Sequence, residues 1–458
     1  MPAFRNMAAT IPDTRLQVGL SNRQILRIAL PISLAILVPQ LNFVINNIFL
    51  GHYNRQALAT ASLTGVYYLI FSMIGVGLNN GLQTLIARRA GENRPGEIGR
   101  LFGQGIFISF VIAAAGIVLT WTVAPLVLKA VIHAPETSAQ AISFLKIRIW
   151  GLPFLYIYQM RNALLVGTNQ SRYLVAGTLA EALANVLFDY LFIFGHWGFP
   201  AWGFNGAAVA SIIAEFTGMI VIFLVIHRKG ISRQFSLFSH FSWDAALARR
   251  ILSLSLPLIL QLAISIISWE FFFILVEHHG ATALAVSSVM RNVFGLMGCV
   301  TWAFAAASSA MVSNIIGQGK KESVVGLLHR ITRMSVLVSL FICGLVNLFP
   351  QTFLSIYGQD AAFVAAAIPV VRVVTVAMLV MCFGTVWLNA ITGTGNSRIT
   401  LLIELCAIIL YCVYVYLVLE RYRLPITWGW MSEWLYWSSI FVLAWLYIRS
   451  GRWKKKVI

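Results

Sequence analysis

One set of residues occurs twice in this chain at a constant separation of 226 positions (residue 31 to residue 257, for example), and this repeat restricts the possible folds more than any other feature. Shared composition aligns Leu and Ala by chance, but it does not align Pro, Gly and Ser-Arg at constant spacing. The chain is therefore two copies of one structural unit. The matched positions are Leu30-Pro31 with Leu256-Pro257, Ala57-Leu58-Ala59 with Ala283-Leu284-Ala285, Gly91 with Gly317, and Gly167-Thr168 and Ser171-Arg172 with Gly393-Thr394 and Ser397-Arg398.

The composition places this unit in a membrane. Hydrophobic residues make up 59% of the chain and charged residues only 10%, whereas soluble domains average about 25% charged residues. The formal net charge of +18 would suggest a nucleic-acid partner for a soluble chain, but membrane proteins collect Lys and Arg in their cytoplasmic loops. We therefore expect a polytopic membrane protein surrounded by the lipid bilayer, with no nucleic-acid partner.

Apolar runs long enough to cross a bilayer follow one another from residue 25 to residue 448. A hydrocarbon core of about 30 Å takes roughly 20 helical residues. We predict an all-α integral membrane protein with twelve transmembrane helices in two parallel six-helix bundles. The bundles are parallel because each copy has six spans, an even number, so both copies begin on the same side of the membrane. The predicted spans are 25–51, 57–87, 98–123, 139–166, 172–195, 205–227, 248–276, 282–313, 323–349, 362–391, 398–419 and 428–448.

Basic residues in the loops predict the orientation. One set of loops is rich in them, whereas the opposite set holds only Arg55, Lys129, Arg421 and Arg423. By the positive-inside rule both termini face the cytoplasm, and the protein is an inner-membrane or plasma-membrane protein. The basic set comprises Arg88, Arg89, Arg94, Arg100, Arg228, Lys229, Arg233, Arg249, Arg250, Lys320, Lys321 and Lys454 to Lys456.

The spans and loops divide the chain into five parts. We expect a cytoplasmic N-terminal arm (1–24), a first lobe (25–227), a basic cytoplasmic connection (228–247), a second lobe (248–448) and a basic tail (449–458). The connection is not rich in Gly, Ser or Pro, so the two lobes form one membrane body and are not tethered domains. We expect this body to act as a monomer.

The sequence lacks the motifs of ATP-driven or enzymatic chemistry. It contains no GxxxxGK(S/T) phosphate loop and no strand-anchored GxGxxG. No loop gathers the His, Cys and carboxylate partners of a hydrolase. The five cysteines lie in apolar runs without the spacing of a metal site or a disulfide framework, so we interpret them as small core residues. We therefore expect that the protein is not an enzyme and that it binds neither an organic cofactor nor a permanent metal ion.

Polar side chains inside the apolar spans are the most informative residues, because each is costly at the membrane centre and usually faces a cavity or a partner. Glu181, Asn185 and Asp189 follow one another at intervals of four residues, which places them near one face of a helix. A carboxylate there can bind and release a proton, and Asp189 with Asn185 can equally offer oxygen ligands to sodium.

The first span carries Asn42 and Asn46 one helical turn apart. Asn46 lies at a similar depth to Asp189, so the two can share a cavity for coupling to a proton or cation. The alternative interpretation, for these residues and for the polar face of the fifth span, is hydrogen-bonded packing between helices.

The second lobe has its own charged candidates. Glu270 in the seventh span and Arg291 in the eighth lie at similar depths, because adjacent spans run antiparallel. One interpretation is a structural ion pair. The other is a coupling or gating pair that opens when a cation, a proton or a substrate competes for the Glu.

A further series of motifs runs through the chain in a specific order. In order and spacing, over essentially the whole chain, the series resembles the MATE family, the multidrug and toxic compound extrusion transporters. The motifs are Leu30-Pro31, Asn46-Asn47-Ile48-Phe49-Leu50-Gly51-His52, Ala57-Leu58-Ala59, the Ala-Arg-Arg-Ala-Gly-Glu run from Ala87 to Glu92, Asn185 with Asp189, and Val312-Ser313 with Ile316-Gly317-Gln318-Gly319.

The resemblance implies a MATE-like fold and cation-coupled antiport, in which small organic, cationic or amphipathic compounds leave while sodium ions or protons enter. It implies no cofactor besides the coupling ion. By the resemblance, the residues that couple transport to cations in the family correspond to Asn185 and Asp189. The Glu that the family has in its seventh span corresponds to Glu270. The chain departs from the family at Asn46, where Asp is usual, and at Met381, where some members have Asp.

Two alternatives to a multidrug exporter fit parts of the sequence. A lipid-linked oligosaccharide flippase of the same superfamily has similar bundles, but commonly has additional spans. A non-transporting membrane scaffold or sensor would not need buried carboxylates. The candidate residues also do not repeat: Asp189 is matched by Val415, Asn185 by Tyr411 and Glu270 by Val44. We therefore expect a symmetric scaffold that carries asymmetric chemistry.

Overall fold

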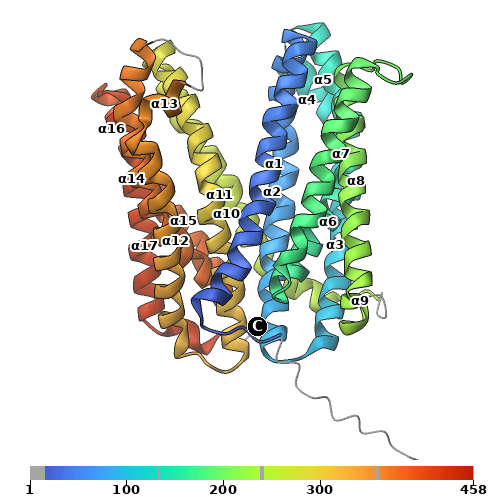
Figure 1. Ribbon diagram of the computed structural model, residues 1–458, viewed down its shortest axis with the longest axis vertical. Helices are drawn as coiled ribbons and strands as arrows, with labels where there is room; N and C mark the ends of the chain where they lie inside the picture. The colour runs from blue at the N-terminus through green and yellow to red at the C-terminus, as the bar shows by residue number, and fades with distance from the viewer. Residues whose placement is uncertain (1–15, 133, 238–241, 356–360, 457–458) are drawn as a thin grey trace, which may run out of the picture.

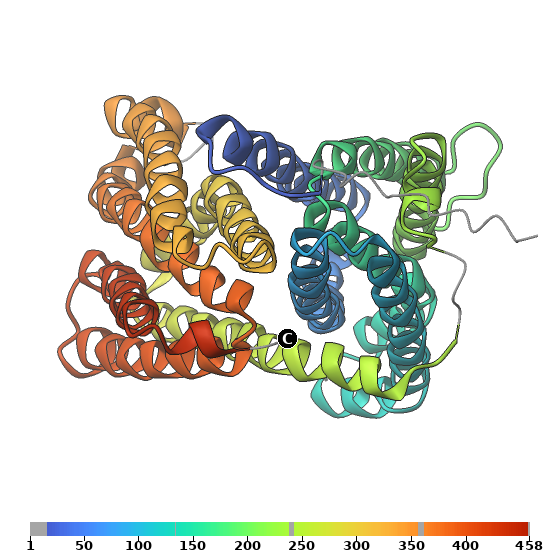
Figure 2. The ribbon, with the colours of Figure 1, turned by 90° about the horizontal axis from the view of Figure 1, so that it is seen from below.

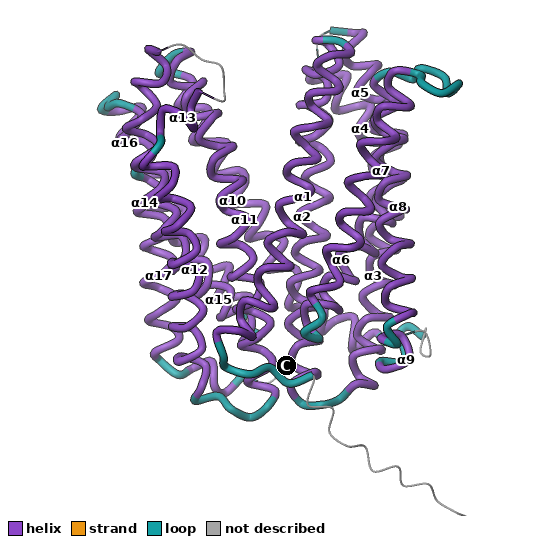
Figure 3. The backbone as a smooth tube through the Cα atoms, in the orientation of Figure 1, coloured by secondary structure: helices purple, strands orange, loops and turns teal. Residues whose placement is uncertain are grey.

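The computed structural model describes residues 16–132, 134–237, 242–355 and 361–456, and all regular structure within them is helical (Figure 3). The first 15 residues of the predicted N-terminal arm lie outside this range. The helices are α1 (Asn22–Tyr53), α2 (Arg55–Gly91), α3 (Pro95–Thr122), α4 (Ala124–Val131), α5 (Pro135–Arg148), α6 (Leu152–Gly167), α7 (Leu174–Phe194), α8 (Phe204–Arg228), α9 (Ile231–Gln234), α10 (Ala245–Glu277), α11 (Ala281–Gly317), α12 (Ser323–Leu348), α13 (Pro350–Ser355), α14 (Ala361–Thr394), α15 (Ser397–Val415), α16 (Ile426–Trp430) and α17 (Ser432–Arg449).

The predicted all-helical membrane architecture is confirmed. Eleven helical segments of the described chain are long and apolar enough to cross a membrane. The predicted fourth span is built from α5 and α6, which are joined by one 3₁₀ turn. The predicted twelfth span corresponds to α17, which is not among the eleven because its 18 residues include Glu433 and Arg449 and are less apolar. This helix packs along α14 and α15.

Local sequence signals set the ends and bends of the helices that carry polar residues. Ser21 caps α1 and Asp244 caps α10, each by accepting a hydrogen bond from a backbone amide of the first turn. Gly195 ends α7 with φ of +76°, a backbone conformation that favours glycine. The repeated prolines Pro31 and Pro257 lie inside α1 and α10, where each removes one backbone hydrogen bond and favours a bend.

The helices form two lobes that converge at the end carrying both described termini and diverge toward the opposite end (Figures 1 and 2). The first lobe contains α1 to α8 and the second contains α10 to α17. The lobes meet chiefly where α2 packs against α10 and α11, and where α1 packs against α11. One cluster of buried apolar side chains runs through both lobes and includes Leu82 and Ile86 of α2 with Phe304 and Met311 of α11. We call the joined end the convergent end.

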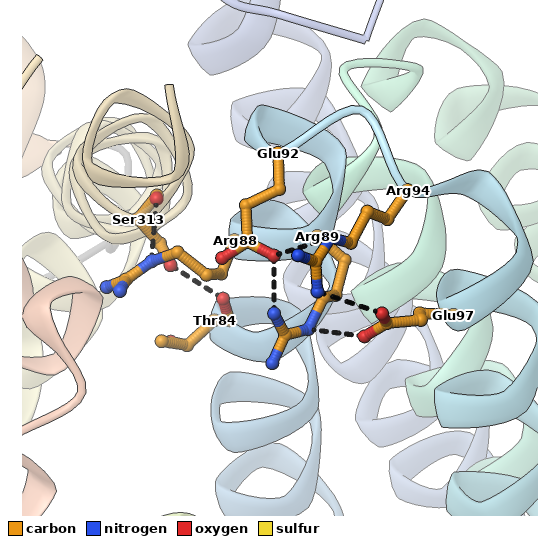
Figure 4. Close-up of polar contacts among 7 residues, drawn as sticks. All are labelled: Thr84, Arg88, Arg89, Glu92, Arg94, Glu97 and Ser313. Atoms are coloured by element: carbon orange, nitrogen blue, oxygen red, sulfur yellow. Dashed lines mark hydrogen bonds and ion pairs between the residues drawn. The ribbon is translucent and has the colours of Figure 1, made fainter. Parts of the chain in front are cut away.

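Polar contacts between α2 and the second lobe reinforce the convergent end (Figure 4). The Nε atom of Arg88 donates to the carbonyl oxygen of Ser313 (3.0 Å). Its Nη2 atom reaches the carbonyl oxygens of Gly393 and Thr394 at the end of α14 (3.3 and 3.4 Å). The Ser313 hydroxyl in turn donates to the carbonyl oxygen of Thr84 (2.7 Å). We call this group the inter-lobe lock; hydrogen bonds from a charged donor are stronger than neutral ones.

Two glycines that match in the repeat allow α2 and α11 to approach closely. A Cβ atom at Gly91 would overlap the carbonyl oxygen of Asn314, and a Cβ atom at Gly317 would overlap that of Arg88. Arg88 and Asn314 are themselves counterparts in the repeat. Both copies therefore use the same positions for the contact between the lobes.

The residues just before α1 cross the convergent end and bind to both lobes. In this strap, Leu16 to Leu20, the Val18 amide donates to the Asn314 side chain of the second lobe (3.1 Å). The Gln17 side chain donates to the carbonyl oxygen of Gly91 in the first lobe (3.0 Å). The described part of the N-terminal arm therefore belongs to the contact between the lobes.

Candidate functional site

Amide side chains of α1 and α7 meet inside the first lobe, where the two helices pack together. The Nδ2 atoms of Asn42 and Asn46 both donate to Oδ1 of Asn185, over 2.5 and 3.0 Å. Asn185 is only 3% exposed. The structure thus brings together the predicted site residues Asn46 and Asn185 and adds Asn42 to them.

Asp189 lies one turn further along α7 and is completely buried. Its Oδ1 atom has no hydrogen-bond partner among the described residues. In the other orientation of the Asn46 amide, its nitrogen atom donates to Oδ2 of Asp189 (2.6 Å), and its distance from Oδ1 of Asn185 is then 3.3 Å instead of 3.0 Å. Asn42, Asn46, Asn185 and Asp189 together are the first-lobe site, which combines oxygen and amide ligands around one carboxylate.

Glu181 lies two turns before Asp189 on α7 and is oriented toward α8. Its Cβ and Oε2 atoms lie against Gly218 of α8. Its Oε2 atom has no partner, and no hydrogen bond among the described residues joins Glu181 to Asn185 or Asp189. An α-helix has 3.6 residues per turn, so side chains eight residues apart are rotated by about 80° from each other. The three residues of α7 that were predicted to share one face therefore point toward two different neighbours, Glu181 toward α8 and Asn185 with Asp189 toward α1.

A buried ion pair that the sequence analysis missed lies near Glu181. Arg148, at the end of α5, binds Glu215 of α8 through both nitrogen atoms of the fork, with Nη1 3.0 Å from Oε2. The Tyr68 ring packs 3.9 Å from the Arg148 guanidinium. The Arg148 guanidinium is also within electrostatic range of Glu181 and Asp189. Matching the charges of the predicted fourth and sixth spans would have limited the partner of Glu215 to Lys146, Arg148 or Arg161.

The pair predicted in the second lobe is formed, and it lies at the surface. Arg291 Nη2 is 2.5 Å from Glu270 Oε1, and the two side chains are 39% and 52% exposed, respectively. The Arg291 guanidinium also lies over the Phe273 and Trp269 rings, at 4.1 and 5.1 Å from their centroids. Neighbouring helices therefore leave both side chains of this pair partly uncovered.

The second lobe has no polar site at the positions equivalent to the first-lobe site. Tyr411 and Val415, the repeat counterparts of Asn185 and Asp189, belong to the apolar core of the second lobe. Met381, where some family members have Asp, is buried in the same core. The asymmetry in sequence is therefore an asymmetry in structure.

The family model of MatE matches the chain twice, over residues 31–191 and 257–417. Both ends of the two matches are separated by 226 residues, which is the separation of the repeat, and together the matches cover more than half of the chain. The chain belongs to the MATE family. This is a family of membrane transporters and not of enzymes. The resemblance that the sequence motifs indicated is confirmed.

Relatives along the full length agree with this membership. The chain is 23% identical over 447 residues to the probable multidrug resistance protein NorM of Thermotoga maritima, covering 95% of this chain and 94% of that relative. Among solved structures, an outward-facing multidrug resistance MATE family transporter of the MOP superfamily superposes with a TM-score of 0.87 at 16% identity, over 98% of this chain and 99% of that one.

A second solved structure matches equally well. It is a MOP superfamily transporter of Pyrococcus furiosus, described as having a binding pocket of reversed polarity that suggests a different function. It superposes with a TM-score of 0.86 at 17% identity, over 98% of this chain and 99% of that chain. At such identities the solved structures establish the fold, which is the two-lobe MATE fold.

Proposed function

We propose that this MATE transporter is a cation-coupled antiporter. It exports drugs, toxins or organic metabolites across the inner or plasma membrane while protons or sodium ions move inward. The observation that carries the proposal is Asp189, a completely buried carboxylate with one oxygen atom that has no partner among the described residues. The name of the Thermotoga relative, a probable multidrug resistance protein, supports the class of substrate.

The charges around α7 support uptake of one positive charge. Three carboxylates, on Glu181, Asp189 and Glu215, share the electrostatic field of Arg148, and Arg161 of α6 donates to the carbonyl oxygen of Gly218, against which Glu181 lies. With all five groups ionised, one negative charge is left without a partner. Because an unpaired buried charge is costly, the lobe is stabilised when a proton or a sodium ion binds. Asp189 is the acceptor in this mechanism, and the amides of Asn46 and Asn185 supply further ligands.

Helix α1 provides the connection between cation binding and the lobes. It carries Asn42 and Asn46 of the first-lobe site, and it packs against α7 of its own lobe and α11 of the other. A cation that changes the hydrogen bonds between α1 and α7 therefore acts on a helix that also contacts the second lobe. Alternating access follows when the lobes rock between two arrangements that differ in their affinity for the cation.

We assign the convergent end to the cytoplasm. The loops at that end carry most of the basic loop residues, including Arg94 and Lys320, which agrees with the positive-inside rule. The diverging end then faces outward. The exposed carboxylate of Glu270 beside aromatic rings suits cationic or amphipathic substrates. One chain contains both lobes, so we take the monomer as the transporting unit.

Replacement of Asp189 by Asn tests the proposal. The Asn side chain has nearly the same shape but neither ionises nor takes up a proton. We expect gradient-driven efflux from proteoliposomes to fall to the level of empty liposomes, while exchange of substrate without a cation gradient continues. The matched control is Glu322→Gln, because Glu322 is 85% exposed and its ion pair within the described chain is with Lys454 at the convergent end; its efflux should equal that of the unmodified protein.

Undiminished efflux by the Asp189→Asn protein would contradict the proposal. Parallel measurements under a sodium gradient and under a proton gradient identify the coupling ion. A panel of dyes and cationic drugs defines the substrate class. Movement of a lipid-linked oligosaccharide analogue without any response to the panel would favour a flippase.

A further inference from the structure

A second buried carboxylate, Glu404 on α15, lies inside the second lobe and is only 2% exposed. Its Oε1 atom accepts hydrogen bonds from the hydroxyl groups of Ser265 on α10 and Tyr436 on α17. Its Oε2 atom lies 3.4 Å from the amide nitrogen of Gln261, also on α10. Two helices, α10 and α17, therefore direct polar groups toward one carboxylate on α15.

No positive side chain in the described part of the chain balances this group. Among the described residues no Lys, Arg or His forms an ion pair with Glu404. Its ionisable hydrogen-bond partner is Tyr436 on α17, and Tyr436 in turn lies near Glu433 of the same helix and packs against the Tyr411 ring of α15. Glu433 is itself buried and accepts a hydrogen bond from the Trp437 indole (3.0 Å). A buried carboxylate without a positive partner is costly when ionised, so this site favours the arrival of one positive charge.

The residues around Glu404 can accept the positive charge either as a proton or as a sodium ion. Hydroxyl groups and a Gln amide each offer an oxygen atom as well as a donor. When they rotate, Ser265, Tyr436 and Gln261 present oxygen ligands of the kind that hard cations prefer. When Glu404 is protonated, it donates to one of the same oxygen atoms. All three partners are partly exposed, so polar groups connect the buried carboxylate with the surface of the lobe.

We propose that Glu404, Gln261, Ser265 and Tyr436 form a second-lobe site that binds one positive charge, carried by a proton or a sodium ion. This inference rests on the proposed cation-coupled function and adds a second coupling site to it. The two sites are not copies of each other, because the repeat counterpart of Glu404 is Thr178. Each lobe therefore holds one carboxylate for coupling on the corresponding span of the repeat, α7 in the first lobe and α15 in the second, but at positions that do not match.

Binding measurements on the purified full-length transporter test the second-lobe site without requiring transport. The sodium arm measures bound radioactive sodium per protein at constant pH. The proton arm follows the infrared band of protonated carboxyl groups during a pH titration. Glu404→Gln should lose one bound sodium ion per protein in the sodium arm, or one carboxyl band in the proton arm. Asp189→Asn should also lose one sodium ion or one carboxyl band, and this loss should add to that of Glu404→Gln when the two changes are combined. The control Glu322→Gln should lose neither.

The outcomes separate this inference from the proposed function. Unchanged sodium binding together with an unchanged infrared titration in Glu404→Gln would overturn the second-lobe site, whatever Asp189→Asn does. Loss in Glu404→Gln without loss in Asp189→Asn would support the second-lobe site and contradict the role of Asp189. Gln has the size of Glu and can keep the hydrogen bonds of Ser265 and Tyr436, so we expect a folded protein by size-exclusion chromatography.

Should Glu404→Gln not fold, the double variant Ser265→Ala/Tyr436→Phe carries the test. It keeps the carboxylate and removes two of its oxygen-bearing partners. We expect sodium affinity to fall, or the infrared titration to shift in pH. If both stay the same as in the unmodified protein, the site is excluded.

Discussion

At the scale of single residues, the position of a carboxylate relative to solvent decides what its partners contribute. Glu215 is buried and has a guanidinium partner, Arg148, on both oxygen atoms. Glu404 is buried, and its donors among the residues that the structure describes are neutral. Glu270 is half-exposed, with Arg291 beside it. These three environments lead to different expectations for stability and for transport.

The exposed and the buried ion pair should respond differently to loss of a charge. Glu270→Gln removes a half-exposed pair and should lower the free energy of unfolding by at most about 1 kcal/mol. Glu215→Gln leaves Arg148 buried without its partner and should cost about 3–5 kcal/mol. Thermal or detergent-induced unfolding of the purified variants measures the difference. Similar losses in both variants would contradict this expectation.

At the scale of helices, the closest contact between the lobes depends on small side chains on α2 and α11. The glycine at the end of each helix lies against backbone of the other helix, and the inter-lobe lock lies just beside this contact. The Ala-Arg-Arg-Ala-Gly-Glu run, which marks the family in the sequence, supplies both Arg88 and Gly91. The motif therefore has a structural role at the convergent end.

A methyl group at this crossing should weaken the convergent end. Gly317→Ala places a Cβ atom against the carbonyl oxygen of Arg88, so α2 and α11 must separate. We expect faster alkylation of a cysteine introduced at Ser309, which is 3% exposed between the lobes, by several-fold over the same cysteine in the parent protein. Gly326→Ala is the matched control, since a Cβ atom there meets nothing within 4 Å.

The control variant Gly326→Ala should leave the alkylation rate unchanged, and it should stabilise α12 by about 0.5–1 kcal/mol because Ala favours a helix interior over Gly. Equal alkylation rates in Gly317→Ala and Gly326→Ala would show that the close approach of α2 and α11 does not hold the convergent end together.

At the scale of the whole molecule, the lobes are joined at one end and separate at the other (Figure 1). The joined end combines an apolar cluster that is shared by both lobes, the inter-lobe lock and the strap from Leu16 to Leu20. A transporter that alternates access must break these contacts in each cycle. Because many weak contacts lie together at the convergent end, they have to break together when the lobes separate there.

A reversible cross-link at the convergent end tests this requirement. The hydroxyl oxygen atoms of Thr84 on α2 and Ser309 on α11 lie 3.3 Å apart, so cysteines at both positions should form a disulfide with small local adjustment. We expect oxidation to abolish efflux from proteoliposomes and reduction to restore it. Single-cysteine variants should be insensitive to both treatments. Full efflux from the fully cross-linked protein would show that the lobes need not separate there.

The local properties of the chain were sufficient to predict its membrane character, its repeat, its family and the positions of nearly all its spans. Apolar length and the order of Pro, Gly and Arg positions are properties of short stretches, so they can be read without a structure. The approach of Asn46 to Asp189 could also be expected, because both were placed at similar depths.

Other features depend on how the helices rotate and which of them become neighbours. The pairing of Arg148 with Glu215 joins α5 to α8, and the orientation of Glu181 follows from the gradual rotation of side chains along α7. The contact of Asn314 with Val18 joins residues 296 positions apart. Such contacts arise when helices pack, since a membrane helix can bury a polar residue only where a neighbouring helix supplies its partner.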